Sequence, residues 1–248
     1  MDFEYAALTH CGRRKNNEDN LCAEPALGLY AVADGMGGYE GGEVASQIAV
    51  ATLAEFLRRN AADDDVTWPF GFDPSLGLDE NLVNVAVRFA HREVAARRTG
   101  ALAQMGSTVA LMVARGDHAV VAHVGDSRVY RLRDARLEQL TRDHSVYAEM
   151  QAAGVADLPP REQCSFANMI TRALGMDAEP SADLRREPLR AGDVFLLCTD
   201  RLTEKLGDAE LAARLALPTA ALACRALVDD AYAAGGRDNI TAVVLRVR

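Results

Sequence analysis

Apolar segments that border an aspartate are the feature that most restricts how this chain can fold. AVVAHVG runs into Asp126, DVFLLCT runs into Asp200 and LYAVA runs into Asp34, while Asp238 precedes the apolar segment ITAVVLRV. Each aspartate therefore stands where a predicted buried strand meets a turn. An ionised carboxylate loses hydration in such a place, so it needs a compensating partner.

A glycine-rich turn follows Asp34, in the segment AVADGMGGYEGG (31–42). A further acidic pair, Glu18 and Asp19, lies in the early turn GRRKNNEDN. Carboxylates gathered without His or Cys favour a hard cation such as Mg²⁺ or Mn²⁺, and glycine lets a backbone carbonyl approach the ion. A single Asp-Gly pair is better explained as an ordinary turn, so the prediction depends on the whole set.

Composition limits the class of protein. The 248 residues are 49% hydrophobic, which favours one large domain over two small ones. The net charge of -9 disfavours general binding to nucleic acid or to anionic membranes. The five cysteines form no CxxC pair, and neither a membrane span nor a signal peptide is recognisable. We therefore expect a cytoplasmic protein without a disulfide framework.

Periodicity predicts both strands and helices. Predicted helices cover 43–59 and 81–97, and a helical block at 208–234 is expected to break at Pro218. The predicted strands cover 3–9, 29–33, 108–114, 119–124, 129–132, 194–198 and 240–247. Runs of strands separated by helices favour a layered α+β domain over regular βαβ alternation.

The motifs DGMGG, GDSR, CTD and GGRDN occur in an order and spacing that resemble the metal-dependent protein phosphatases of the type 2C (PPM) family, its bacterial branch most closely. The resemblance extends through GRRKNNED, MGSTVALMV, LTRDHSV and ITRALG, and so covers essentially the whole chain. It implies an α+β fold in which two stacked antiparallel β-sheets are flanked by α-helices on both sides, as a single domain over 1–248.

The resemblance also implies a site with two Mn²⁺ or Mg²⁺ ions. Asp34 would bridge the two ions, and Asp200 and Asp238 would be further ligands of one of them. A third, more weakly bound ion would use Asp126 with Asp200. The other ion would be held by Glu18, Asp19 and the carbonyl of Gly35, partly through water. A water shared by the two ions would attack phosphorus, and Arg14 would bind the phosphate because a guanidinium suits bidentate recognition.

The activity implied is that of a Ser/Thr protein phosphatase, with phosphoserine and phosphothreonine proteins and a Ser/Thr kinase as partners. Substrate contacts are expected within 144–170. Ser127 and Arg128 are interpreted as turn scaffolding, and Met36 stands where animal relatives carry a histidine, so a metal-bound water is the expected proton donor.

One departure from the family pattern leaves alternatives open. Arg201 replaces the glycine expected after Asp200. If that position needs positive φ, arginine would cost about 1 to 2 kcal/mol, whereas a side chain directed to solvent would be tolerated. Arg201 thus supports a pseudophosphatase that binds phosphoproteins without turnover as the main alternative, and a two-metal hydrolase of small phosphoesters is the second.

Overall fold

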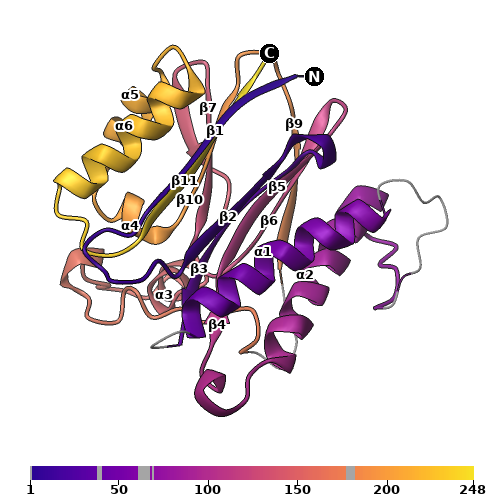
Figure 1. Ribbon diagram of the computed structural model, residues 1–248. Coiled ribbons are helices and arrows are strands. Elements are labelled where there is room, and N and C mark those ends of the chain that lie inside the picture. Colours follow the sequence, from indigo (N-terminus) through magenta and orange to yellow (C-terminus); the bar gives the residue numbers. More distant parts are fainter. Residues whose placement is uncertain (1, 38–40, 61–67, 69, 177–181) are drawn as a thin grey trace.

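Two antiparallel sheets stack face to face, and helices cover the outer face of each (Figure 1). The computed structural model describes residues 2–37, 41–60, 68, 70–176 and 182–248. One sheet has the strand order β1-β11-β10-β7-β8 and the other β2-β3-β5-β6-β9, with β4 paired to β3. This arrangement confirms the α+β sandwich that the resemblance implies.

The bounds of the elements are as follows. The first sheet contains β1 (Phe3–His10), β7 (Arg128–Arg133), β8 (Arg136–Gln139), β10 (Val194–Cys198) and β11 (Ile240–Val247). The second contains β2 (Asp19–Glu24), β3 (Leu29–Met36), β4 (Gly106–Ser107), β5 (Val109–Arg115), β6 (His118–Val124) and β9 (Asp183–Pro188). The α-helices are α1 (Gly41–Asn60), α2 (Leu78–Ala96), α3 (Val146–Ala152), α4 (Asp200–Thr203), α5 (Asp208–Leu215) and α6 (Ala220–Ala233).

The central strands are apolar throughout because both of their faces are buried. In β3, Ala31 and Ala33 pack toward α1, whereas Tyr30 and Val32 belong to the core between the sheets. Strand β11 alternates in the same way between the inter-sheet core and the layer under α5 and α6. A period of two residues therefore distributes one apolar run over two cores.

Predicted and observed elements agree for all seven strands, and the helical block breaks around Pro218 between α5 and α6. Helices α1 and α2 begin two and three residues earlier than predicted, and α3 and α4 were not predicted. The missed strands are β2, β4, β8 and β9. No helix of the described residues has the length and apolar character needed to cross a membrane.

Candidate metal and phosphate site

Strands β2 and β3 bring two acidic side chains together at one end of the inter-sheet core. Asp19 and Asp34 are direct cross-strand partners, so both project to the same face of the sheet. That face is the one on which Tyr30 and Val32 meet the other sheet. The core between the sheets thus ends in a pair of carboxylates.

The opposite sheet holds Asp19 in place through two threonines. Oδ2 of Asp19 accepts hydrogen bonds from Oγ1 of Thr241, at 2.6 Å, and from Oγ1 of Thr199, at 2.9 Å. Oδ1 of Asp19 is buried and has no hydrogen-bond partner in the described part of the chain, and the same is true of Oδ1 of Asp200. Buried carboxylate oxygens without a hydrogen-bond donor are suited to bind a cation.

Close approach of the backbone explains two glycines near this pair. A Cβ on Gly35 would lie 1.9 Å from the carbonyl oxygen of Gly42, and a Cβ on Gly42 would lie 2.6 Å from Oε1 of Glu18 and 2.8 Å from the carbonyl oxygen of Gly35. The carbonyl of Glu18 accepts from the N–H of Gly35 and from Oγ of Ser46. Only glycine fits at both positions, which keeps the Gly35 carbonyl beside the Glu18 carboxylate.

The remaining aspartates of the predicted set come from three other segments. Asp126 is buried in the turn after β6, Asp200 opens α4, and Asp238 lies two residues before the start of β11. Asp238 lies beside the N-terminal turn, because a Cβ on Gly12 would lie 2.0 Å from the carbonyl oxygen of Asp238, so only glycine fits there. Asn239 fixes this turn as well, because its Oδ1 accepts from the N–H of Glu18 at 2.8 Å.

The electrostatics of this group favour added positive charge. Burial is the main cause that raises the pKa of Asp19 and of Asp126 to about 7 and that of Asp200 to about 6, and neighbouring carboxylates add to the rise. The pKa of Asp34 rises well above its usual range for the same reasons, and burial also raises that of Glu18. Protons or cations must therefore neutralise the group.

Two arginines border the group. Nη2 of Arg14 donates to Oδ2 of Asp238 at 2.8 Å, and the side chain of Arg14 is 61% exposed, so a ligand can reach it. Arg201 lies in the helical conformation of α4, so the steric cost expected from positive φ is absent. Its side chain does not turn away to solvent either, because Nε lies 3.4 Å from Oδ1 of Asp200 and 3.5 Å from Oδ2 of Asp238.

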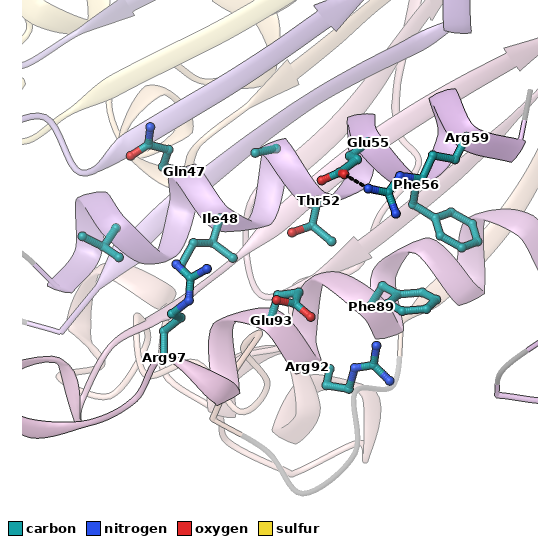
Figure 2. Close-up of a pocket in the computed structure, with 12 residues that line it drawn as sticks. Gln47, Ile48, Thr52, Glu55, Phe56, Arg59, Phe89, Arg92, Glu93 and Arg97 are labelled. Carbon is teal, nitrogen blue, oxygen red and sulfur yellow. Dashed lines mark hydrogen bonds and ion pairs between the residues drawn. The ribbon is translucent and has the colours of Figure 1, made fainter.

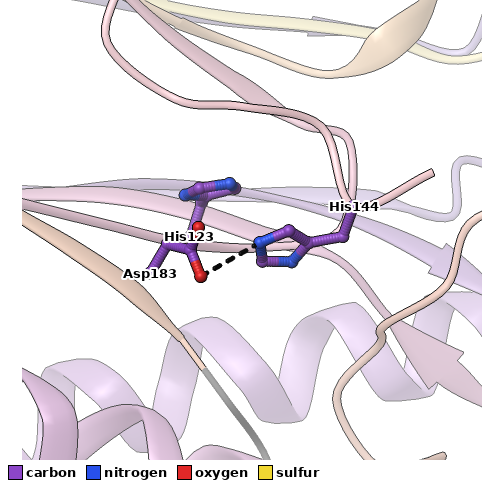
Figure 3. A group of neighbouring side chains, drawn as sticks. All are labelled: His123, His144 and Asp183. Atoms are coloured by element: carbon purple, nitrogen blue, oxygen red, sulfur yellow. Dashed lines mark ion pairs between the residues drawn. The ribbon is translucent and has the colours of Figure 1, made fainter. Parts of the chain in front are cut away.

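A tighter trio of possible ligands lies elsewhere. His123, His144 and Asp183 lie together, with one potential ligand atom of each within 4.8 Å of the others (Figure 3). Among the described residues, the predicted carboxylates do not form so close a group. Nδ1 of His144 accepts from the N–H of Gly125, so Nε2 of the neutral ring carries the proton and faces Oδ1 of Asp183 at 3.4 Å.

That tautomer leaves His144 no lone pair on Nε2 for a metal. Burial and the stacked ring of His123 lower the pKa of His144 to about 4, so the ring is neutral near pH 7. Nη1 of Arg172 also lies 2.9 Å from Oδ1 of Asp183, where a cation would sit. The trio is therefore a hydrogen-bonded support for the turn that carries Asp126.

Two residues interpreted as scaffolding in the same turn do have structural contacts. Oγ of Ser127 is 2.7 Å from Oγ1 of Thr108, which accepts from the N–H of Asp34. Arg128 makes two hydrogen bonds to the carboxylate of Asp143. The contacts of Ser127 and Arg128 thus tie the Asp126 turn to neighbouring strands and to the segment before α3.

A cavity of about 720 Å³ lies between α1 and α2 (Figure 2), and none of the predicted site residues lines it. A smaller one, of about 330 Å³, lies beside α4 and the segment after α3. It is lined by Arg128, Arg161, Cys164, Ala167, Asn168, Thr203, Glu204 and Lys205. The smaller cavity adjoins the carboxylate group through Glu204, to which Arg201 is bound.

Sequence reasoning missed the residues that support the carboxylates, namely Thr199, Thr241, Asn239 and Ser46. Thr199 directly precedes the predicted ligand Asp200 in CTD, and Asn239 directly follows Asp238 in RDN. This proximity in sequence is the signal that could have indicated both residues. Thr241 is identified only once β11 is known to lie opposite β2.

Comparisons with known proteins agree with this geometry. A family model described as Protein phosphatase 2C matches residues 9–228. The serine/threonine protein phosphatase PstP of Mycobacterium tuberculosis is 37% identical over 251 residues, which are 99% of this chain but 45% of that protein. The serine/threonine phosphatase stp of Listeria monocytogenes is 30% identical over 94% of this chain and 90% of its own length.

Among solved structures, the catalytic domain of PstP in complex with two manganese ions superposes with a TM-score of 0.80 at 36% identity, covering 99% of both chains. The chain thus spans about half the length of the mycobacterial proteins and nearly all of the Listeria one. The residues matched by the family model include every predicted site residue except Asp238. The alignments with the mycobacterial and Listeria proteins each cover nearly all of this chain. The chain belongs to the protein phosphatase 2C family.

Proposed function

We propose that the chain, acting over 1–248 as a single catalytic domain, is a serine/threonine protein phosphatase that depends on Mn²⁺ or Mg²⁺. One observation supports this most directly: the carboxylates of Asp19, Asp126 and Asp200, from three other segments, lie near enough to Asp34 to raise its pKa. Oδ1 of Asp19 and of Asp200 also lacks a hydrogen-bond partner among the described residues. Further support comes from the relatives, which are named as serine/threonine phosphatases.

The residues present fit two hard cations. Asp34 is the proposed bridging ligand, and Asp200 and Asp238 are the proposed ligands of one ion. Glu18, Asp19 and the carbonyl of Gly35 are proposed for the other, and Asp126 with Asp200 for a weaker third. Carboxylate oxygens, and a backbone carbonyl made accessible by the glycines, favour Mg²⁺ or Mn²⁺ over soft metals.

When bound, two such ions supply a nucleophile at neutral pH and offset the charge that develops on the phosphoryl group. Arg14 is proposed to bind the phosphoryl oxygens, because its exposed guanidinium is held beside the carboxylates by Asp238. The threonines that hold Asp19 fix the orientation of its carboxylate before any substrate binds.

The peptide around the phosphorylated residue is proposed to contact the cavity beside α4. Arg161 and Asn168 bring the segment 144–170 to this cavity, and Lys205 adds a positive charge to those of Arg128 and Arg161. A phosphopeptide would contact these side chains, whereas a small aryl phosphate would not. Arg161→Ala should therefore raise KM for a phosphopeptide and leave KM for an aryl phosphate unchanged.

Phosphoproteins, including a Ser/Thr kinase, are the proposed partners, and the cytoplasm is the proposed place of action, in keeping with five free cysteines. The experiment is release of phosphate from a phosphothreonine peptide, measured against Mn²⁺ concentration with EDTA as control. Turnover that rises with Mn²⁺ supports the proposal. Binding of the peptide without turnover at any metal concentration would instead identify a pseudophosphatase, and cleavage of aryl phosphate alone a hydrolase of small phosphoesters.

A further inference from the structure

Arg201 stands where the family pattern has glycine, and its backbone fits that position without strain. It is the second residue of α4, and the non-glycine residues with positive φ among those described are Asp134, Ala135 and Asp157. The arginine therefore adds a side chain at no backbone cost. The contacts of that side chain decide what it contributes.

The guanidinium of Arg201 lies between two proposed metal ligands on one side and a third carboxylate on the other. Its Nε is 3.4 Å from Oδ1 of Asp200 and 3.5 Å from Oδ2 of Asp238. Its Nη1 donates to both carboxylate oxygens of Glu204, at 2.9 and 2.8 Å. Glu204 also accepts from Nδ2 of Asn168, so the acceptor is itself held in place.

These contacts bring a permanent positive charge to carboxylates that repel one another. Arginine stays protonated at every accessible pH. Arg14 contacts Asp238 alone, whereas Arg201 contacts Asp200 as well. Without a divalent ion, the charge on Arg201 offsets repulsion between Asp200 and Asp238; with an ion present, the same charge repels the ion.

We propose that Arg201 is a tethered cation that neutralises Asp200 and Asp238 in the metal-free protein, and that the divalent ion at these two residues binds by displacing it. Glu204 gives the guanidinium a place to remain, because Nη1 stays bound there when Nε leaves the aspartates. The proposal rests on the proposed function only in taking Asp200 and Asp238 as ligands. It makes this chain harder to load with metal than a relative with glycine at this position.

The test is Mn²⁺ binding to the full chain by titration calorimetry, together with the melting temperature in EDTA and in excess Mn²⁺. Arg201→Ala should lower Kd for the Mn²⁺ held by Asp200 and Asp238 by about tenfold or more, because one repelling charge is lost. It should also lower the melting temperature in EDTA by about 2 °C or more, and this difference should vanish or reverse in Mn²⁺.

Three further variants separate charge from size and position. Arg201→Gln keeps most of the side chain and should behave like Arg201→Ala, whereas Arg201→Lys keeps the charge and should bind Mn²⁺ like the natural protein. Arg214→Ala removes an arginine of similar exposure that pairs with Asp230 in α6, and should leave Kd unchanged.

Equal Kd values for the natural protein, Arg201→Ala and Arg201→Gln would overturn the tethered-cation proposal and leave the proposed function intact. The same holds if Arg201→Lys binds Mn²⁺ as tightly as Arg201→Gln, since the positive charge would then have no effect on binding. Failure of Mn²⁺ to bind to any of these proteins would instead refute the ligand assignment itself, and with it the proposed function.

Discussion

Asp19 and Asp34 lie directly opposite each other across the β2–β3 pair, and both point into the end of the inter-sheet core. Two like charges in this position destabilise each other, and burial adds the cost of lost hydration. The fold holds them there nonetheless, with Thr199 and Thr241 bonded to Asp19 from the opposite sheet. The arrangement therefore lowers the stability of the metal-free protein, while it keeps the carboxylates in place to bind a cation.

Asp34→Asn should therefore have opposite effects on stability and on activity. Loss of the bridging carboxylate should reduce phosphopeptide turnover by about 100-fold or more, since even supporting residues of metal sites commonly matter by 10–100-fold. The same change relieves repulsion, so the melting temperature in EDTA should rise, by about 2–4 °C for each kcal/mol relieved. Asp229→Asn, which alters an exposed acid of α6, is the control and should change neither. Unchanged turnover in Asp34→Asn would contradict the ligand assignment.

Stability of the metal-free protein should fall as pH rises toward neutrality. Burial raises the pKa of Asp19 and Asp126 to about 7 and that of Asp200 to about 6, whereas an aspartate in an unfolded chain titrates near about 3.9. Between about pH 4 and about pH 7 the folded protein thus holds protons that the unfolded chain has released. Its stability is highest below this window and is lost through it.

The measurement is the melting temperature from about pH 5 to about pH 8, in EDTA and in excess Mn²⁺. We expect a decline in EDTA that levels off above about pH 7, and a rise or no change in Mn²⁺, because the ion favours the ionised carboxylates. A melting temperature in EDTA that does not fall over this range would show that these carboxylates are not protonated in the metal-free protein.

Strand prediction succeeded where burial on both faces produced an apolar run, as in β3 and β11. Besides β2 and the two-residue β4, it missed the charged strands β8 and β9. Strand β8 has the sequence RLEQ and β9 the sequence DLRREP, which lack any clear apolar alternation. Ion pairs hold them instead, since Glu138 of β8 contacts Arg131 of β7 and Arg185 of β9. Such pairing depends on neighbours distant in sequence and leaves no local pattern.

The candidate site divides in the same way. The sequence indicates Asp34, Asp126, Asp200 and Asp238 as candidates because each borders an apolar segment, whereas the ligand roles of Asp19 and Gly35 come from the family resemblance. The direction of the Arg201 side chain could not be predicted, because it depends on contacts with Glu204 and with Asp238, and Asp238 is distant in the sequence. Neither alternative left open for Arg201 holds: the residue is helical, so there is no strain from positive φ, and its side chain contacts Asp200 and Asp238 instead of pointing to solvent.

Arg14→Ala should raise KM for a phosphopeptide by about tenfold while kcat changes less, because an interaction used for substrate capture is lost. Arg14→Lys should restore little, since an ammonium cannot make the paired hydrogen bonds of a guanidinium. Steady-state kinetics with a phosphothreonine peptide measure both. The neighbouring exposed Arg13 gives the control Arg13→Ala, which should leave KM unchanged. Equal effects of the two alanine variants would reduce the role of Arg14 to general attraction of anions.

Gly42→Ala should disrupt the ion held by Glu18 and the Gly35 carbonyl. The added Cβ would lie 2.6 Å from Oε1 of Glu18 and 2.8 Å from the Gly35 carbonyl oxygen, so one of these proposed ligands must move. We expect Mn²⁺ affinity to fall and the free energy of unfolding to drop by about 1–3 kcal/mol, as for other overpacked sites. Titration calorimetry and urea unfolding measure the two effects. Gly207→Ala, where the nearest atom to a Cβ is 3.8 Å away, is the matched control. Because crowding at Gly42 acts on these two oxygens directly, unaltered Mn²⁺ affinity in a folded Gly42→Ala protein would exclude them as ligands.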